Sequence, residues 1–183
     1  IGLDGKDAAS YRYRAQAYLA NDNTNDAIED YSRAIAADPN NAELYVARGR
    51  AYITAKNNPA AVKDLGKALE IDAKSAPALV YRGLSKARQS QFEDALADFS
   101  KAVESDPRFV PAYVHRAWTY RQMEQPETGL RDIERALKLE PRQPHMWYQL
   151  ATLYLDLGRE AEARRTFETA LEHNPGMGAA YNS

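Results

Sequence analysis

Apolar, aromatic and small residues recur along this chain at helical spacings, in segments that come in pairs. In the first segment of a pair, an aromatic residue precedes a small one by four positions and a second aromatic by seven, as in Tyr11, Ala15 and Tyr18. The matching stripe of the second segment is Ala27, Ile28, Tyr31, Ala34 and Ile35. Spacings of three and four place such residues on one face of an α-helix. The pattern therefore predicts pairs of amphipathic helices.

The same pattern returns every 34 residues. Proline marks one position of the period: Pro39, Pro107, Pro141 and Pro175, with Ala73 in between. Small residues mark two others: Ala34, Ala68, Ala102, Ala136 and Ala170, and Ala27, Ala61, Ala95, Gly129 and Ala163. A period of this length indicates stacked copies of one helical unit, each of which buries its apolar face against its neighbours. We set the units at residues 8–41, 42–75, 76–109, 110–143 and 144–177.

Polar and proline-containing breaks divide each unit. Segments such as 21–23, 57–59 and 125–126 separate its two helices. The dipeptides Asp38-Pro39 and Asp106-Pro107 end the second helix, because proline disfavours the helical conformation in the residue before it. The predicted fold class is therefore all-α: a right-handed α-solenoid, or superhelix, of tandem helix–turn–helix units.

The combined pattern resembles that of the tetratricopeptide repeat (TPR) family over residues 8–177. The matching residues are Tyr11, Ala15, Tyr18, Ala27, Tyr31, Ala34 and Pro39 in the first unit, and Trp147, Ala151, Tyr154, Ala163, Phe167, Ala170 and Pro175 in the last. Four positions depart from the pattern: Lys86 replaces an aromatic residue, Gly129 an alanine, Ala73 a proline and Arg164 an aliphatic residue. The resemblance implies that the first helices of the units line a concave surface, along which ligands usually lie.

Both ends of the chain continue the period. Ile1 and Asp4 stand one period before Ile35 and Asp38, so residues 1–7 are interpreted as the tail of a preceding repeat. Tyr181 falls on the first aromatic position, so residues 178–183 are predicted to begin a sixth, incomplete repeat. The sequence shows no polar capping helix, which favours a piece of a longer array. A natural C-terminus with a short stub is the alternative.

Arginine and aspartate occupy two further positions of the period. They are Arg14, Arg48, Arg82 and Arg116, and Asp30, Asp64, Asp98 and Asp132. In the fifth unit both are lost together, to Leu150 and Thr166. This joint loss predicts that each arginine pairs with an aspartate across the helix interface, because a guanidinium can bind a carboxylate through two hydrogen bonds. The alternative is a row of arginines that binds an acidic ligand.

The first-helix positions that face away from the core stripe are rich in apolar and aromatic residues, with arginines interspersed. A solvated helix face would be mostly charged, whereas interface hot spots have this composition. The predicted partner-binding residues of the concave groove are Arg12, Tyr13, Gln16, Val46, Arg50, Val80, Tyr81, Leu84, Arg88, Val114, His115, Trp118, Arg121, His145 and Tyr148.

Trp118 is the most distinctive residue of this set, because it lies off the core stripe of its unit, formed by Tyr113, Ala117 and Tyr120. A large aromatic side chain facing a groove commonly anchors a side chain of the partner. The alternative is that Trp118 packs against a neighbouring first helix. Trp147, in contrast, takes the aromatic position of the core stripe and is expected to be buried.

Some TPR domains hold the C-terminal carboxylate of a chaperone with lysines, asparagines and an arginine on the first helices. At the corresponding positions this chain has Arg12, Gln16, Ala47, Pro77 and Tyr81. Because the lysines and asparagines are missing, a chaperone-tail co-adaptor of that type is not expected.

Composition and charge narrow the function classes. The formal net charge is −2, so no overall basic field attracts the phosphates of nucleic acids. Cysteine is absent, which excludes disulfides and thiolate chemistry. No apolar run is long enough to span a bilayer, so direct membrane insertion is not expected. The alanine- and arginine-rich composition is typical of bacterial sequences and is compatible with either the cytoplasm or the periplasm.

The sequence shows no catalytic or metal-binding pattern. His115 and His145 come from successive units, but two histidines without a carboxylate at matched spacing make a poor metal site. No glycine-rich phosphate loop, nucleophile elbow or paired-carboxylate signature is recognised. We therefore expect no enzyme activity, no cofactor and no metal.

These observations favour a protein–protein interaction scaffold that binds a peptide segment of a partner protein in its concave groove. Two alternatives stay open. One is a targeting or regulatory arm of a larger enzyme whose catalytic domain lies outside this sequence, and the other is a homo-oligomer that assembles through uncapped ends. RNA binding by a repeat code is a further alternative, against which the mild acidity argues.

Overall fold

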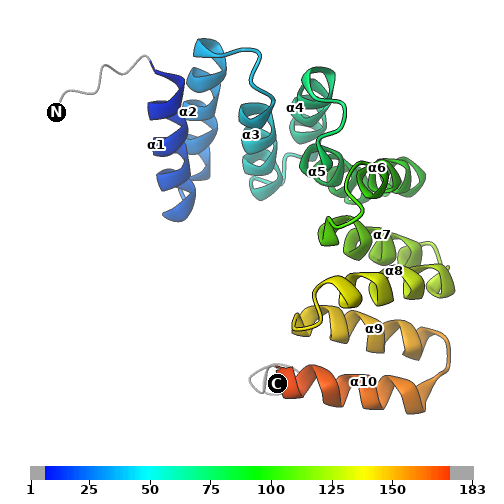
Figure 1. Cartoon of the computed structure of the whole chain (residues 1–183). Helices are drawn as coiled ribbons and strands as arrows, with labels where there is room; N and C mark the ends of the chain where they lie inside the picture. The colour runs from blue at the N-terminus through cyan, green and yellow to red at the C-terminus, as the bar shows by residue number, and fades with distance from the viewer. Residues whose placement is uncertain (1–6, 174–183) are drawn as a thin grey trace. The chain divides into compact units, whose positions relative to one another are not determined.

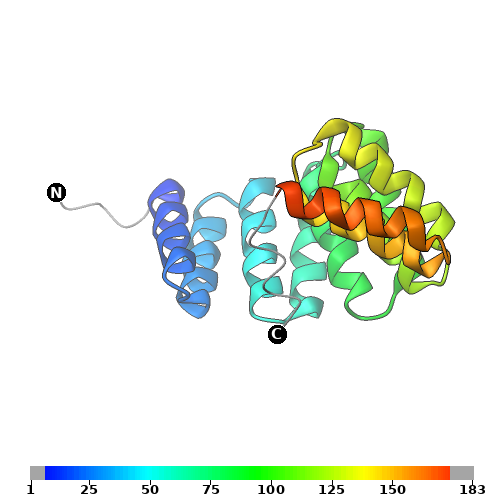
Figure 2. The ribbon, with the colours of Figure 1, turned by 90° about the horizontal axis from the view of Figure 1, so that it is seen from below.

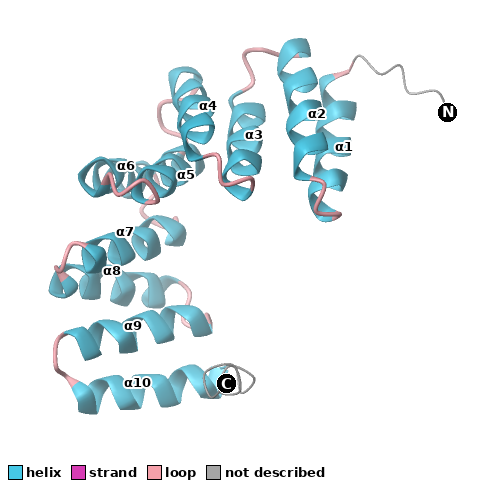
Figure 3. Cartoon of the chain, turned by 180° about the vertical axis from the view of Figure 1, so that it is seen from behind, coloured by secondary structure: helices cyan, strands magenta, loops and turns pink. Residues whose placement is uncertain are grey.

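The computed structural model describes residues 7–173 of the 183-residue chain. These residues form ten α-helices joined by short loops, with no β-strand among them (Figure 3). In chain order the helices are α1 (Ala8–Ala20), α2 (Thr24–Ala37), α3 (Ala42–Thr54), α4 (Asn58–Ile71), α5 (Ala76–Ala87), α6 (Phe92–Ser105), α7 (Val110–Gln122), α8 (Pro126–Leu139), α9 (Pro144–Asp156) and α10 (Glu160–His173).

Two sequence predictions lie outside this range. They concern the tail of a preceding repeat at residues 1–7, of which only Asp7 is described, and the sixth repeat at residues 178–183. Asp7 directly precedes α1.

The helices pack in consecutive antiparallel pairs, from α1 with α2 to α9 with α10. The first helices of the pairs begin at Ala8, Ala42, Ala76, Val110 and Pro144, which are 34 residues apart each time. The predicted fold class, an all-α solenoid of tandem helix–turn–helix repeats, is confirmed.

The chain divides into two compact units. Unit 1 comprises residues 1–105 and contains α1–α6, whereas unit 2 comprises residues 106–183 and contains α7–α10. Within unit 1, α2 also packs on α3 and α4 on α5, and within unit 2, α8 packs on α9. Figures 1 and 2 show these helices in two orthogonal views, α1–α6 from blue to green and α7–α10 from green to red. Within each unit, every helix thus packs against the next one in the chain.

Glycine and alanine allow the paired helices to approach closely. A Cβ atom added at Gly83 would lie 2.7 Å from Cε1 of Phe99, and one added at Gly49 would lie 2.8 Å from Cγ of Leu65. Both distances are well below the 3.5–4.0 Å at which carbon atoms attract one another. The small residue on the first helix therefore makes room for a large buried side chain on the second.

The turn inside each helix pair is also repeated. One residue at its tip has a positive φ, between 58° and 69°: Asp22, Lys56, Ser90, Glu124 and Gly158. The N–H of the next residue donates to the carbonyl five positions earlier, for example from Asn23 to Tyr18 at 2.9 Å, which closes the C-terminus of the first helix. Four of the five turns place a residue other than glycine in this conformation, at a cost of about 1 kcal/mol each.

An aromatic residue near the start of a first helix hydrogen-bonds to the proline loop that precedes it. The bonds run from Tyr45 to the carbonyl of Pro39 (3.1 Å), from Tyr113 to that of Pro107 (3.1 Å) and from Trp147 to that of Pro141 (2.7 Å). Where Ala73 replaces the proline, the aromatic is replaced by Leu79, so both partners change together. Trp147 is half-buried and stacks on His173, so the expectation that it is buried is only partly met.

Candidate functional site

The predicted arginine–aspartate pairs form, and they join the two helices of a pair. Each arginine donates through Nε and Nη2 to the aspartate sixteen residues later, in the pairs Arg14–Asp30, Arg48–Asp64, Arg82–Asp98 and Arg116–Asp132. The aspartates are buried, and the bonds in the last three pairs measure 2.6–2.9 Å. Hydrogen bonds from Arg14 lower the pKa of Asp30, and the bond to Asp64 raises the pKa of Arg48. An incoming acidic ligand would find these arginines already paired, so the series is structural.

The fifth helix pair replaces this ion pair with two uncharged residues. Leu150 and Thr166 are both buried, and the Thr166 hydroxyl donates to the carbonyl of Glu162 at 2.8 Å. A buried charge without its partner would be costly, whereas these two side chains leave none. The joint loss of arginine and aspartate therefore has a structural cause.

Lys86, the departure from the family pattern on α5, has a defined role. Its Nζ lies 2.9 Å from Oδ2 of Asp98. The two carboxylate oxygens of Asp98 also accept one hydrogen bond each from Arg82. Asp98 is therefore held by two cations, both from the preceding helix.

A pocket of about 340 Å³ lies between the first helices of unit 1. Its lining comes from Gln16 and Leu19 on α1, Tyr31 on α2, Ala47, Arg50, Ile53 and Thr54 on α3, and Tyr81 and Leu84 on α5. We call it the unit-1 pocket. The guanidinium of Arg50 lies over the ring of Tyr81, 5.2 Å from its centroid. Burial raises the pKa of Tyr31, while the charges of Arg50 and Arg12 lower it.

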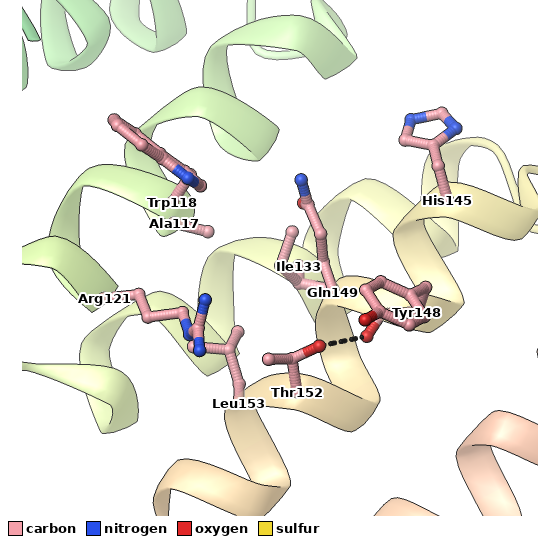
Figure 4. A pocket seen from close by; sticks show the side chains of 9 residues that line it. All are labelled: Ala117, Trp118, Arg121, Ile133, His145, Tyr148, Gln149, Thr152 and Leu153. Atoms are coloured by element: carbon pink, nitrogen blue, oxygen red, sulfur yellow. Dashed lines mark hydrogen bonds between the residues drawn. The ribbon is translucent and has the colours of Figure 1, made fainter. Parts of the chain in front are cut away.

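Unit 2 has a pocket of about 410 Å³ between its two first helices. Its lining comes from Ala117, Trp118 and Arg121 on α7, Ile133 on α8, and His145, Tyr148, Gln149, Thr152 and Leu153 on α9. We call it the unit-2 pocket. Figure 4 shows Trp118 and Arg121 on the α7 side of the space and Gln149, Tyr148 and Thr152 on the α9 side.

The two pockets occupy corresponding places in the repeat. Trp118, Arg121 and Ile133 stand three periods after Gln16, Leu19 and Tyr31, and Gln149 and Thr152 stand three periods after Ala47 and Arg50. The repeat therefore builds the same type of hollow twice, with different side chains.

Polar groups of the unit-2 pocket differ in how well they are satisfied. Oε1 of Gln149 is buried and has no hydrogen-bond partner. Arg121, by contrast, donates to both carboxylate oxygens of Asp156 on α9, at 2.5 Å and 3.3 Å, and this bond raises the pKa of Arg121. The positive charge of this pocket is thus already compensated.

Sequence comparison agrees with this architecture. The sequence profile of the tetratricopeptide repeat matches residues 14–77 and again residues 115–181. The chain belongs to the tetratricopeptide repeat family. Matches to this TPR protein exist among solved structures, but no curated protein is significantly similar to it in sequence.

Three solved structures show the likeness of the fold. PilF of Pseudomonas aeruginosa is 22% identical, with a TM-score of 0.82 over 91% of this chain and 76% of that one. MamA of Desulfovibrio magneticus RS-1 is 20% identical, with a TM-score of 0.80 over 96% of this chain and 98% of that one. YrrB, described as a TPR protein with an unusual peptide-binding site, is 18% identical, with a TM-score of 0.70 over 94% and 89%.

Eight of the predicted partner-binding residues of this TPR protein line the two pockets. They are Gln16, Arg50, Tyr81 and Leu84 in unit 1, and Trp118, Arg121, His145 and Tyr148 in unit 2. Trp118 is half-buried, and Tyr148 packs its ring at 5.4 Å from that of Phe167. A half-buried ring still offers surface inside the pocket, and the role of Trp118 as an anchor for a partner side chain stays a prediction.

The remaining predicted residues lie outside the pocket linings. Val80 and Val114 are only 1% and 8% exposed, so they have no surface to offer a ligand and the prediction for them needs correcting. Val46 packs against the core of unit 1. The other four, Arg12, Tyr13, Arg88 and His115, are half-buried or exposed around the pockets.

Tyr31 and Ile133 are lining residues that the sequence did not indicate. Both occupy the aromatic or aliphatic position of a second helix, which the pattern assigns to the core, and both are indeed buried. In the sequence, the one feature that could have indicated these two lining residues is that both occupy the same position of the 34-residue period.

The described residues contain no cluster of three or more histidines, cysteines, aspartates or glutamates that could hold a metal ion. None of the described helices has the length and apolar character needed to cross a membrane.

Proposed function

We propose that this TPR protein is an interaction scaffold that binds an extended segment of a partner protein along its first helices. The observation that carries the proposal is the recurrence of a pocket at the same place of the repeat in both units. TPR scaffolds are generally non-catalytic, and we propose no catalytic role for these residues. The description of YrrB as a TPR protein with a peptide-binding site supports the proposal by analogy.

The chemistry of the pockets suits a peptide. Each pocket combines an aromatic surface with side chains capable of hydrogen bonding. In unit 1 the ring is that of Tyr81 and the polar side chains are Gln16 and Thr54; in unit 2 they are Trp118 and Gln149. Aromatic rings in such hollows contribute most of the binding energy of an interface.

The test is affinity capture of partners from cell lysate, followed by titration of the partner segment identified. We would compare the unaltered chain with Trp118→Ala, Leu84→Ala and the control Ile71→Ala. Ile71 is an exposed apolar residue at the end of α4 and lines neither pocket. Circular dichroism would show that each variant is folded.

Under the proposal, Trp118→Ala or Leu84→Ala weakens binding of the segment by about tenfold or more, as expected for a central interface residue, and Ile71→Ala does not. Equal binding by all four proteins would contradict a role of the pockets. A mass above that of the monomer in light scattering of the isolated chain, unchanged by the pocket variants, would favour self-assembly instead.

A further inference from the structure

The first helices of unit 1 are basic, although the chain as a whole is weakly acidic. Helices α1, α3 and α5 contain six basic residues and a single acidic one, Glu43. Four of the basic residues are paired with aspartates of the second helices, two of them with the same aspartate, Asp98: Arg14, Arg48, Arg82 and Lys86. Arg12 and Arg50 remain.

Arg50 is the more exposed of the two. It is exposed and lines the unit-1 pocket. Within the described residues, its guanidinium contacts the face of the Tyr81 ring and makes neither a hydrogen bond nor an ion pair. A guanidinium stacked on a ring keeps its N–H donors along its edge, so the fork that binds a carboxylate through two bonds stays open.

Arg12 adds a second charge from the neighbouring helix α1. Its Nε is buried and has no hydrogen-bond partner in the part of the chain that the structure describes. Its Nη1 lies 3.5 Å from Glu43, whose side chain is 82% exposed, so this ion pair is weak. Arg12 and Arg50 both act electrostatically on Tyr31, the aromatic residue that lines the pocket from α2.

Arg88, the residue that follows α5, continues the series. Arg12, Arg50 and Arg88 are each 38 residues apart, which is one period plus about one helical turn. They therefore form a diagonal across three successive first helices. Arg88 donates to the carbonyl of Ile53, a lining residue of the pocket, at 3.5 Å, and makes no ion pair among the described residues.

Unit 2 offers the opposite arrangement. The arginine of its pocket, Arg121, is bound by Asp156 across α7 and α9. An acidic group entering that pocket would compete with a carboxylate already in place. The difference between the pockets is thus one of charge: compensated in unit 2 and uncompensated in unit 1.

We propose that the unit-1 pocket recognises an acidic segment of the partner, with the carboxylate of an aspartate or glutamate bound by Arg50 and an apolar neighbour packed on Leu19 and Leu84. This inference rests on the proposed function and specifies its ligand. Charge complementarity identifies the occupant, because a bidentate arginine–carboxylate bond is among the strongest that a polar groove can make. Gln16, Ala47 and Tyr81, which also line this pocket, stand at positions of the chaperone-tail clamp, but Arg50, Leu19 and Leu84 do not.

The test uses three fluorescein-labelled peptides of equal length, in which leucine alternates with aspartate, with asparagine or with lysine. Each is titrated by fluorescence anisotropy against the full chain, Arg50→Gln, Arg50→Lys and the control Lys63→Gln. Lys63 is an exposed cation on the second helix α4, so its loss changes the net charge equally without touching the pocket.

The aspartate peptide should bind at least about tenfold more tightly than the asparagine peptide, and Arg50→Gln should remove this preference. Arg50→Lys should restore it in part, because lysine keeps the charge but lacks the fork. Lys63→Gln should leave it intact. Added salt should weaken the binding of the aspartate peptide.

Two results would overturn the inference. If the aspartate and asparagine peptides bind equally, or if Arg50→Gln and Lys63→Gln behave alike, the acidic preference is wrong, although a groove that binds both peptides remains. If none of the peptides binds at millimolar concentration, the acidic preference is also wrong. In that case the capture experiment with Trp118→Ala and Leu84→Ala still decides separately whether the pockets bind a partner.

Discussion

Arg82 on α5 holds Asp98 on α6 through two hydrogen bonds, 2.9 Å and 2.6 Å long, and only 2% of the surface of Asp98 is exposed. Lys86 adds a third contact at 2.9 Å. The same type of bond recurs in four of the five helix pairs, so it is a repeated element of stability rather than a binding site.

Replacing Asp98 with alanine should destabilise the protein strongly. The change leaves two cations without the carboxylate that binds them in a partly buried place, so we expect the free energy of unfolding to fall by about 3 kcal/mol. Urea denaturation measures this. Asp94→Ala, on the exposed side of the same helix, is the control, and an equal effect of the two changes would show that the buried pair is energetically neutral.

The uncharged residues of the fifth helix pair suggest a second test of whether arginine and aspartate stabilise each other. Arg48→Leu and Asp64→Thr each leave a charge without its partner, whereas the double variant reproduces the combination Leu150 and Thr166. We expect the double variant to lose at least about 1 kcal/mol less than the sum of the single losses. The double-mutant cycle is completed by unfolding the four proteins in urea. Additive losses would mean that Arg48 and Asp64 do not stabilise each other.

Stability should fall in acid because of Asp30. Hydrogen bonds from Arg14 and Arg33 hold the pKa of Asp30 below 3.8, its value in the unfolded chain. A folded-state pKa below the unfolded one contributes stability above the unfolded pKa, and this contribution disappears as the pH falls through the lowered pKa.

The unaltered protein should therefore exceed Asp30→Asn in free energy of unfolding at neutral pH, and the difference should shrink as the pH drops below about 4. Thermal or urea unfolding across this range provides the measurement. Asp26→Asn, exposed on the same helix, should show no such convergence. A difference independent of pH would contradict the assignment.

Two glycines should respond oppositely to the same substitution. Gly83→Ala places a methyl group 2.7 Å from the buried ring of Phe99, and we expect a loss of about 1–3 kcal/mol. Gly66→Ala, also within a helix, meets nothing within 4 Å, and should gain about 0.5–1 kcal/mol from helix propensity. Calorimetric melting temperatures distinguish the two. A stabilising Gly83→Ala would show that α5 and α6 can separate at little cost.

The repeat pattern predicted the helices because it states both their period and their buried face. Residues such as Ala34 and Tyr31 belong to the core in the structure, as their spacing indicates. The pairing of Arg48 with Asp64 was also predictable, because the arginine and aspartate positions of the period both lose their charge in the same repeat, the fifth helix pair. The positive φ at Lys56 and Ser90 was not, since neither residue type favours that conformation and only the closure of the turn requires it.

The sequence indicated only in part which side chains line the pockets. Val80 and Trp118 both lie off the core stripe in sequence, yet Val80 is buried and Trp118 keeps surface inside a pocket. Periodicity assigns a residue to a face of its own helix, but the neighbouring helix decides how much of that face is covered.

For this protein, the sequence alone determined the all-α repeat, its 34-residue register and the positions of its ion pairs, because these depend on contacts that recur in every copy. The tertiary structure decided which cations stay uncompensated. Arg121 and Arg50 look alike in sequence, but Asp156 on α9 binds Arg121 on α7, whereas Arg50 contacts the ring of Tyr81 and has no ion pair within residues 7–173. Such contacts occur once, between side chains far apart in the chain, and so no repeat pattern records them.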